Sequence, residues 1–244
     1  MRDPLEREES SGIDAQALEV SQEVPVELSV NGHKATLLCT PTDLKALALG
    51  WLFTQGLIEG LEEVGSLAVC DDLRKIIART ERDLWEERGG LSQVLTSGCG
   101  GGSILGEVLT EVLPPVESDL TISAGKLRSL VRATLDRSLL YKERGGIHCA
   151  SLADGQGVRF VAEDVGRHNA LDKVIGMGLE AGADFSSMVI TSTGRITSEM
   201  ILKAARVGVP IVASLSIPSD LAVEIAESGG ITLVGRAAGS RMRV

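Results

Sequence analysis

Residues 188–235 read MVITSTGRITSEMILKAARVGVPIVASLSIPSDLAVEIAESGGITLVG, a regular alternation of strand-like and helix-like segments. Three short apolar runs (188–193, 210–216 and 231–235) predict β-strands, and the segments between them carry apolar residues at helical spacing. Strands joined by a single helix run parallel, because a right-handed crossover returns the chain in the same direction. This stretch therefore predicts an α/β layered domain built on a parallel sheet.

The same pattern extends upstream from this stretch. The predicted elements are a helix (122–141), two strands joined through a Gly-Gln-Gly turn (148–154 and 158–165) and a further helix (169–182). Before them, the segment LPPVESD (113–119) combines two prolines with acidic residues, which is typical of a domain boundary. We therefore expect one domain over residues 116–244.

The first half of the chain predicts a smaller α+β domain over residues 21–115. Residues 24–40 read as two strands around Asn31-Gly32, because Asn-Gly supplies the positive φ angles of a tight hairpin turn. The segment 42–58 predicts an amphipathic helix, and weaker strand patterns follow at 65–95. Apolar residues at helical spacing in that helix are Leu44, Leu47, Ala48, Trp51 and Leu52. Residues 1–20 are polar and patternless, and we expect them to be disordered.

Composition excludes several classes of protein. A formal charge of −10 and only 2% aromatic residues argue against a nucleic-acid partner, which needs basic surfaces and stacking side chains. The acidic start of the chain does not resemble a secretory signal, and no segment approaches the roughly 20 apolar residues of a membrane helix. The sequence predicts a soluble cytoplasmic protein of 244 residues without a membrane partner.

The four cysteines are scattered without a CxxC pair, which favours reduced thiols over disulfides or a closed zinc site. His148 and Cys149 are adjacent, but a deaminase-type zinc site needs an H-x-E element followed by PCxxC. Ala150 stands where that Glu would be, and no PCxxC occurs in the chain. We expect no metal ligands.

Two loops at the predicted strand ends have residues suited to phosphate binding. In TSTGRITSE (191–199), Thr193, Gly194 and Arg195 precede a helix N-terminus, where free backbone N–H groups attract anions. The loop SLSIPSD (214–220) offers hydroxyl groups in the same way. Its hydroxyl-bearing candidates are Ser214, Ser216 and Ser219. The alternative is that these hydroxyls only cap the helices that follow.

The turn EDVGRHN, residues 163–169, gathers several chemically active side chains. His168 could act as a general acid or base, Arg167 could bind an anion, and Asp164 or Asn169 could hydrogen-bond to a base edge. The alternative is a solvated, well-capped turn.

The motif TSGCGGGS, residues 96–103, places Cys99 before three glycines. Glycines remove side-chain bulk and let backbone N–H groups turn toward the sulfur, which would stabilise a thiolate. A thiolate is the form that accepts and transfers sulfur, so Cys99 is our candidate catalytic residue. The alternative is an inert thiol in a loop.

The C-terminal segment GRAAGSRMRV, residues 235–244, holds the densest positive charge of the chain in Arg236, Arg241 and Arg243. These guanidinium groups could clamp phosphates, or they could form a basic tail without a ligand.

These motifs together resemble the FdhD formate dehydrogenase accessory proteins over about residues 23–244. The matching blocks are EVPVELSVNG, TPTDLKALALGWLFTQGLI, TSGCGGG, GGIHCASLAD, EDVGRHNALDKVIG, TSTGRITSEMILKAARVGVPIVASLSIPSDLAVEIA and GITLVG. EDVGRHNALDK and TGRITSEM are the most specific of these.

The resemblance implies a cytidine-deaminase-like three-layer C-terminal domain without zinc, and a homodimer. It implies a sulfurtransferase that takes persulfide sulfur from a cysteine desulfurase and passes it to the bis-molybdopterin guanine dinucleotide form of the molybdenum cofactor, before that cofactor enters formate dehydrogenase. The family's carrier cysteine lies in a CGxCG loop and maps onto Cys99, with Gly102 at the second cysteine position.

The family's cofactor-binding segment also has a counterpart here. It maps onto Arg236, Ala237, Ala238, Gly239, Ser240 and Arg241, where the aromatic residue and the first Arg of the family pattern are missing. We expect GDP to bind as a fragment of the cofactor. Two other functions remain open: a passive chaperone that only delivers cofactor, and, on fold analogy alone, a zinc nucleoside deaminase.

Overall fold

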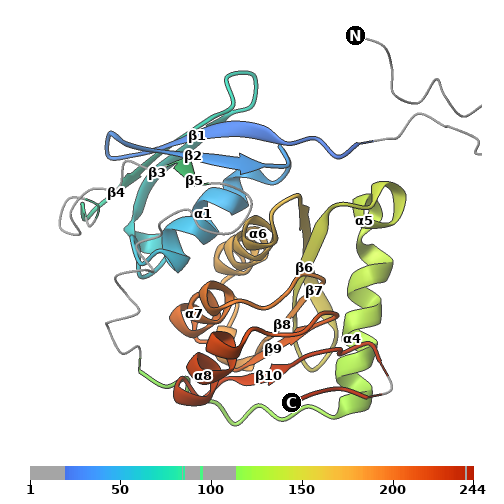
Figure 1. Cartoon of the computed structure of the whole chain (residues 1–244). Helices are drawn as coiled ribbons and strands as arrows, with labels where there is room; N and C mark the ends of the chain where they lie inside the picture. The colour runs from blue at the N-terminus through green and yellow to red at the C-terminus, as the bar shows by residue number, and fades with distance from the viewer. Residues whose placement is uncertain (1–19, 84, 86–93, 96–113, 240) are drawn as a thin grey trace, which may run out of the picture.

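The computed structural model describes residues 20–83, 85, 94–95, 114–239 and 241–244 (Figure 1). These residues form two five-stranded mixed sheets with helices packed between and around them. The first sheet has the order β3-β4-β1-β2-β5, and the second has the order β10-β9-β8-β6-β7. The chain is thus a mixed α/β protein, and Cys99 and Ser240 lie outside the described residues.

The first sheet forms from the N-terminal half of the chain. Its elements are β1 (Val24–Val30), β2 (His33–Cys39), α1 (Leu44–Thr54), the short 3-10 helix η1 (Leu61–Glu63), β3 (Val64–Cys70), β4 (Lys75–Thr80) and β5 (Val94–Leu95). The predicted hairpin at Asn31-Gly32 is confirmed, with φ angles of 50° and 96° at the two turn residues. The Asn31 side chain also donates to Thr80 Oγ1 at 2.8 Å, which fixes the turn against β4.

Helix α1 is buried on all sides, whereas the sequence predicts an amphipathic helix. Ten of its eleven residues are buried. One face packs on the first sheet and the opposite face packs on α6 (Arg167–Glu180) of the second half, as Figure 1 shows. The prediction was wrong because the second covering surface lies far away in the sequence and leaves no local periodic signal.

The second sheet forms from the C-terminal half. Its elements are α4 (Ala124–Arg137), α5 (Leu139–Arg144), β6 (His148–Ala153), β7 (Val158–Asp164), α6 (Arg167–Glu180), the 3-10 helix η2 (Phe185–Ser187), β8 (Val189–Ser192), α7 (Ser198–Val207), β9 (Ile211–Ser214), α8 (Asp220–Ser228) and β10 (Thr232–Val234). Strands β8, β9 and β10 are parallel, as predicted. The sheet as a whole is not parallel, because β6 pairs antiparallel with both β7 and β8.

A single helix was predicted at 122–141, but the structure has two, α4 and α5, separated at Ser138. Ser138 has extended backbone angles, and its hydroxyl donates to Thr134 O at 2.8 Å. The buried hydroxyl thus bonds to the carbonyl of the preceding turn as the backbone leaves the helix.

Helices cover both faces of the second sheet (Figure 1). Helix α4 packs on one face in a small apolar cluster that includes Leu127, Leu130 and Val131. Helices α6, α7 and α8 pack on the other face, in a larger cluster that continues through α1 to the first sheet. No helix among the described residues is long and apolar enough to cross a membrane.

Candidate functional site

Four loops meet where β7, β8, β9 and β10 end. We call this region the strand-end rim; it comprises residues 165–168, 193–199, 214–219 and 235–239. Backbone hydrogen bonds join the last three of these loops in series: Ser219 N donates to Ile196 O at 3.0 Å, and Arg236 N donates to Ser216 O at 2.9 Å. The loops predicted to bind phosphate and the predicted C-terminal segment are therefore neighbours in space.

The hydroxyl groups predicted at these loops are mostly used inside the protein. Ser214 is fully buried; its Oγ donates to Gly194 O at 2.5 Å and accepts from Ser216 N at 3.0 Å. Thr193 Oγ1 accepts from Cys149 N at 3.0 Å. Ser219 caps α8 by accepting from a backbone N–H in the first turn. The capping alternative holds for Ser219, and the Ser214 and Thr193 side chains mainly hold the loops in place.

Gly194 lies directly against the start of α6. A Cβ at this position would lie 3.0 Å from Cβ of Arg167 and 3.3 Å from Nδ1 of His148, so a larger residue would push these side chains. Arg167 is almost fully buried there. Burial and the nearby Arg167 charge lower the pKa of His148, which therefore favours the neutral imidazole. The buried Arg167 charge of the rim thus lies beside a neutral ring.

The N-termini of two helices open onto this rim. Helix α6 has Gly166 as its N-cap, and α7 has Thr197; neither residue accepts a backbone N–H bond with its side chain. First-turn N–H groups without a side-chain cap carry partial positive charge and attract anions. Together with Arg167, they make the rim electrostatically suited to a phosphate group.

His168 joins these two helix N-termini. Its Nε2 lies 3.3 Å from Thr197 Oγ1 and 3.2 Å from Glu199 Oε2. Burial lowers the pKa of His168 to about 3, and the charges of Lys203 and Arg167 act in the same direction. The imidazole is therefore neutral near pH 7, and its contact with Glu199 is a polar contact of a neutral ring rather than an ion pair.

Asp164 and Asn169 of the EDVGRHN turn face the first half of the chain. Asp164 forms a fully buried ion pair with Lys173 at 2.8 Å and accepts from Thr40 N at 3.0 Å. Asn169 Nδ2 donates to Leu38 O at 2.8 Å and to Asp164 Oδ1 at 3.0 Å. We call Leu38, Thr40, Asp164, Asn169 and Lys173 the buried joint. Sequence reasoning missed Lys173, although a lysine between apolar helix positions is a usable signal of a buried ion pair.

The basic residues of the C-terminal segment are exposed. Arg236 and Arg241 face solvent, as does Arg195 of the β8–α7 loop. Ala237 is fully buried beneath α4, and Gly239 O accepts from Arg128 Nε at 3.2 Å. Residues 236–239 of this segment thus belong to the rim, Arg236 and Arg241 are accessible, and the role of the segment in ligand binding stays a prediction.

The cysteines of the described residues differ sharply in environment. Cys39 is buried, and burial raises the pKa of its thiol to about 12. Burial also raises the pKa of the Cys149 thiol. Both are therefore poor nucleophiles. Cys70 is exposed at the end of β3. Within the described residues, no group of three or more His, Cys, Asp or Glu side chains could hold a metal ion.

Comparisons with known proteins agree on one family. A family model described as the FdhD/NarQ family matches residues 21–244. The sulfur carrier protein FdhD of Shouchella clausii is 35% identical over 228 residues, covering 88% of this chain and 83% of that protein. The sulfur carrier protein FdhD of Xanthomonas axonopodis pv. citri is 37% identical over 225 residues, covering 88% of this chain and 79% of that protein.

A solved structure has a similar fold. The crystal structure of a candidate formate dehydrogenase accessory protein from Desulfotalea psychrophila superposes with a TM-score of 0.72 and 28% sequence identity. The matched region covers 91% of this chain and 86% of the Desulfotalea psychrophila chain.

Proposed function

Because this chain belongs to the FdhD/NarQ family of sulfur carrier proteins, we propose that it carries sulfur to the molybdenum cofactor of formate dehydrogenase. In this proposal a cysteine desulfurase loads sulfur onto Cys99 as a persulfide. The acceptor is the bis-molybdopterin guanine dinucleotide form of the cofactor, before its insertion into formate dehydrogenase. The observation that carries the proposal is the anion-suited rim, where two helix N-termini meet beside the buried Arg167.

The described thiols support Cys99 as the carrier. Cys39 and Cys149 are buried with raised pKa values, so a sulfur carrier is expected among the other two cysteines. Cys70 lies at the end of β3 in the first sheet, away from the rim elements in Figure 1. Cys99 has the glycine-rich context that a reactive thiol needs.

Strand β5 gives a second argument for Cys99. Leu95 pairs with Leu37 in parallel, and the carbonyl of the next residue on β2, Leu38, is bonded to Asn169 of α6. Cys99 follows Leu95 by four residues, and four residues of any conformation span at most about 14 Å. Covalent reach therefore supports a thiol that works close to the N-terminus of α6.

The rim is the proposed site for the guanine dinucleotide. Its pyrophosphate oxygens would accept from the first-turn N–H groups of α6 and α7, with the Arg167 charge beside them. The exposed guanidinium groups of Arg195, Arg236 and Arg241 are further candidates for phosphate contacts. GDP is the simplest fragment that has both guanine and a diphosphate.

Three further features follow from the family and remain proposals. They are a cytoplasmic location, a homodimer, and a cytidine-deaminase-like arrangement of the C-terminal domain. Helix layers on both faces of the second sheet support that arrangement.

The sulfur step is tested with paired cysteine variants. We expect Cys99→Ala to abolish rescue of formate dehydrogenase activity in cells that lack the native protein, and Cys70→Ser to leave it unchanged. Mass spectrometry after incubation with desulfurase and cysteine should show one added sulfur atom on Cys99. Rescue by Cys99→Ala would refute the sulfur-carrier role. Rescue without an added sulfur would instead favour the passive delivery chaperone.

The nucleotide site is tested by calorimetry. We expect GDP to bind more tightly than ADP, and Arg167→Met to weaken GDP binding by about tenfold or more, because a charge-assisted contact is lost. Equal affinity for GDP and ADP would remove the guanine site from the proposal.

A further inference from the structure

Helices α4 and α5 carry an excess of positive charge in an acidic protein. Residues 124–144 contain six Lys or Arg residues and two acidic residues, a formal charge of +4, whereas the whole chain has a formal charge of −10. Figure 1 shows the two helices following one another along the outer side of the second sheet. We call their outward surface the basic face, and its arginines are Arg128, Arg132, Arg137 and Arg144.

The described residues around the basic face do not balance its charge. None of the four arginines forms an ion pair within the described part of the chain, and Asp136 of α4 is already paired with Lys142 at 3.6 Å. Glu143 is the one other acidic residue of the two helices. Arg128 and Arg132 lie one turn apart on α4, and like charges at this spacing repel each other. The basic face is therefore suited to a partner that brings negative charge.

Residues 1–19 of this chain bring that charge. They contain six acidic residues and two arginines, which gives a formal side-chain charge of −4, equal and opposite to the charge of residues 124–144. The acidic residues are Asp3, Glu6, Glu8, Glu9, Asp14 and Glu19. Opposite charges of equal size make the two segments complementary.

The described chain next to this segment lies beside the basic face. Ser21 Oγ lies 3.5 Å from Gly145 O, and Gly145 directly follows Arg144, the last residue of α5. Helices α4 and α5 have 14 and 6 residues, which corresponds to about 30 Å of helix. A chain of nineteen residues can span up to about 65 Å. Residues 1–19 are therefore long enough to follow both helices from the end of α5.

We propose that residues 1–19 bind to the basic face of their own chain as an acidic internal ligand. Single surface ion pairs are weak, but a tethered segment has an effective concentration on the order of millimolar at its site, and several pairs act together. Leu139 at the start of α5 is 62% exposed and offers an apolar contact between the arginines. The bound segment shields these guanidinium groups from other acidic chains. The inference does not depend on the sulfur step or on the nucleotide site.

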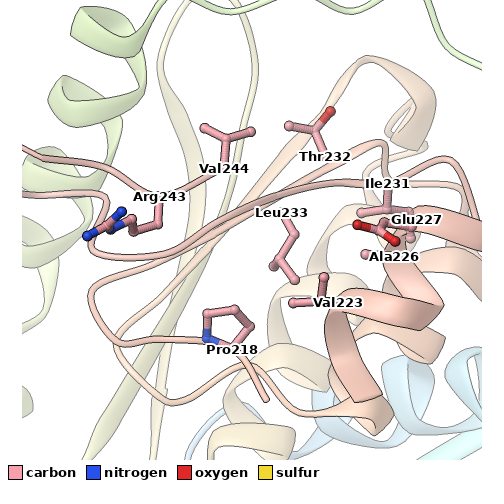
Figure 2. Close-up of a pocket in the computed structure, with 9 residues that line it drawn as sticks. All are labelled: Pro218, Val223, Ala226, Glu227, Ile231, Thr232, Leu233, Arg243 and Val244. Atoms are coloured by element: carbon pink, nitrogen blue, oxygen red, sulfur yellow. The ribbon is translucent and has the colours of Figure 1, made fainter. Parts of the chain in front are cut away.

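The groove between α8 and β10 is a less suitable place for this segment (Figure 2). The groove has a volume of about 360 Å³, and Val223 and Leu233 are among its apolar lining residues. Figure 2 shows Glu227 and Arg243 on opposite sides of Leu233. The Glu227 carboxylate repels an acidic segment and offsets the attraction of Arg243. Charge complementarity therefore favours the basic face.

Paramagnetic relaxation in NMR spectra tests the position of the segment in the full chain. A nitroxide label is attached at Ser10→Cys, with Cys70→Ser and Cys99→Ala to direct the label, because the other two cysteines are buried. We expect the backbone amide signals of residues 128–144 to lose intensity, and those of residues 64–80 in the first sheet to keep it. Added salt should reverse the loss, because it screens contacts between exposed charges.

Charge exchange identifies the contact. Arg132→Glu with Arg144→Glu should restore the amide signals, and neutralising the segment with Glu6→Gln, Glu8→Gln and Glu9→Gln should restore them as well. The two sets of substitutions change opposite partners, so the test does not depend on the folding of one variant. Combining the reversed face with Glu6→Arg, Glu8→Arg and Glu9→Arg should bring the loss of intensity back, because each charge then meets its opposite again.

A matched control neutralises three exposed carboxylates of the first half of the chain, with Glu62→Gln, Asp71→Asn and Asp72→Asn. It changes the net charge by the same amount as the neutralised segment, and it should leave the loss of intensity unchanged. Full intensity at residues 128–144 in the labelled chain would overturn the inference, and so would a loss confined to the strand-end rim. A loss that appears when labelled chain is mixed with unlabelled, isotope-enriched chain would show that the segment comes from another copy, which would also overturn it.

Discussion

Gly50 of α1 and Gly176 of α6 meet backbone to backbone across the helix crossing that joins the two halves of the chain. A Cβ on Gly50 would lie 1.7 Å from Asp172 O, and a Cβ on Gly176 would lie 1.9 Å from Ala46 O. Both distances are far below van der Waals contact with atoms that belong to helix backbones. Only glycine therefore permits the observed separation of α1 and α6.

We predict that Gly50→Ala and Gly176→Ala each lower the free energy of unfolding by about 3 kcal/mol or more, because the helices must move apart and leave packing defects. Urea unfolding measures this. Gly125→Ala in the first turn of α4 is the control, since its nearest neighbour would be 4.0 Å away; it should change stability by at most about 1 kcal/mol. Equal effects at all three positions would contradict the close crossing.

A second prediction concerns the contribution of the buried joint to the unfolding free energy. In Asp164→Asn, the Lys173 ammonium group stays buried without its carboxylate partner, and we expect a loss of about 3–5 kcal/mol in unfolding free energy. The surface pair of Lys45 and Glu180 is the control, and Glu180→Gln should cost less than about 1 kcal/mol. The double variant Asp164→Asn with Lys173→Met should recover part of the loss, because no unpaired charge remains. Additive losses would argue against the ion pair.

We predict that the lowered pKa of His168 makes the stability of the protein depend on pH. In the unfolded chain the His168 imidazole gains a proton near pH 6.5, but in the folded protein only near pH 3, so protonation favours unfolding. Stability should therefore fall as the pH drops from about 6.5 toward 3, by up to about 1.4 kcal/mol per pH unit from this group.

The matching experiment compares the native chain with His168→Gln by urea unfolding at pH 7, 6 and 5. The lowered pKa of His148 adds to this loss in both proteins, and the raised pKa of Asp172 opposes it in both. The difference between the two proteins isolates His168. We expect the variant to lose less stability on acidification; identical slopes would mean that the imidazole is not held neutral.

The contact of Gly194 with α6 predicts a selective effect on ligand binding. In Gly194→Val the added side chain displaces Arg167 and His148 at the rim, and we expect GDP affinity to fall by about tenfold or more. Gly155→Val is the control, because no atom lies within 4 Å of a Cβ there. Calorimetry and thermal unfolding on both variants separate lost binding from lost stability. Unchanged GDP affinity in Gly194→Val would place the nucleotide elsewhere.

Much of the fold can be predicted from local patterns in the sequence. The hairpin at Asn31-Gly32 follows from backbone angles that few other residues adopt, and the parallel order of β8, β9 and β10 follows from the alternation of strands and helices. The burial of α1 on both faces could not be predicted in this way, because α6, which covers the second face, is more than a hundred residues away in the sequence. The break at Ser138 has neither Pro nor Gly to mark it.

Only part of the candidate site could be placed from the sequence. The sequence predicts that the loop of Gly194 lies at the strand ends, and the structure adds Arg167 and His168 of the EDVGRHN turn beside that loop. The sequence does not reveal that Asp164 and Asn169 turn inward to the buried joint. The side chains of Asp164 and Asn169 are as polar as those of Arg167 and His168. Asp164 and Asn169 point inward because they bond to Thr40 and Leu38, which are distant in the sequence.

The shared core across α1 and α6 has a consequence for protein engineering. A chimera that combined the first half of this chain with the second half of a relative would bring together two helices selected in different proteins, at a crossing that tolerates no added methyl group. Recombination at the proline-rich segment 113–119 should therefore fail unless both helices come from the same parent.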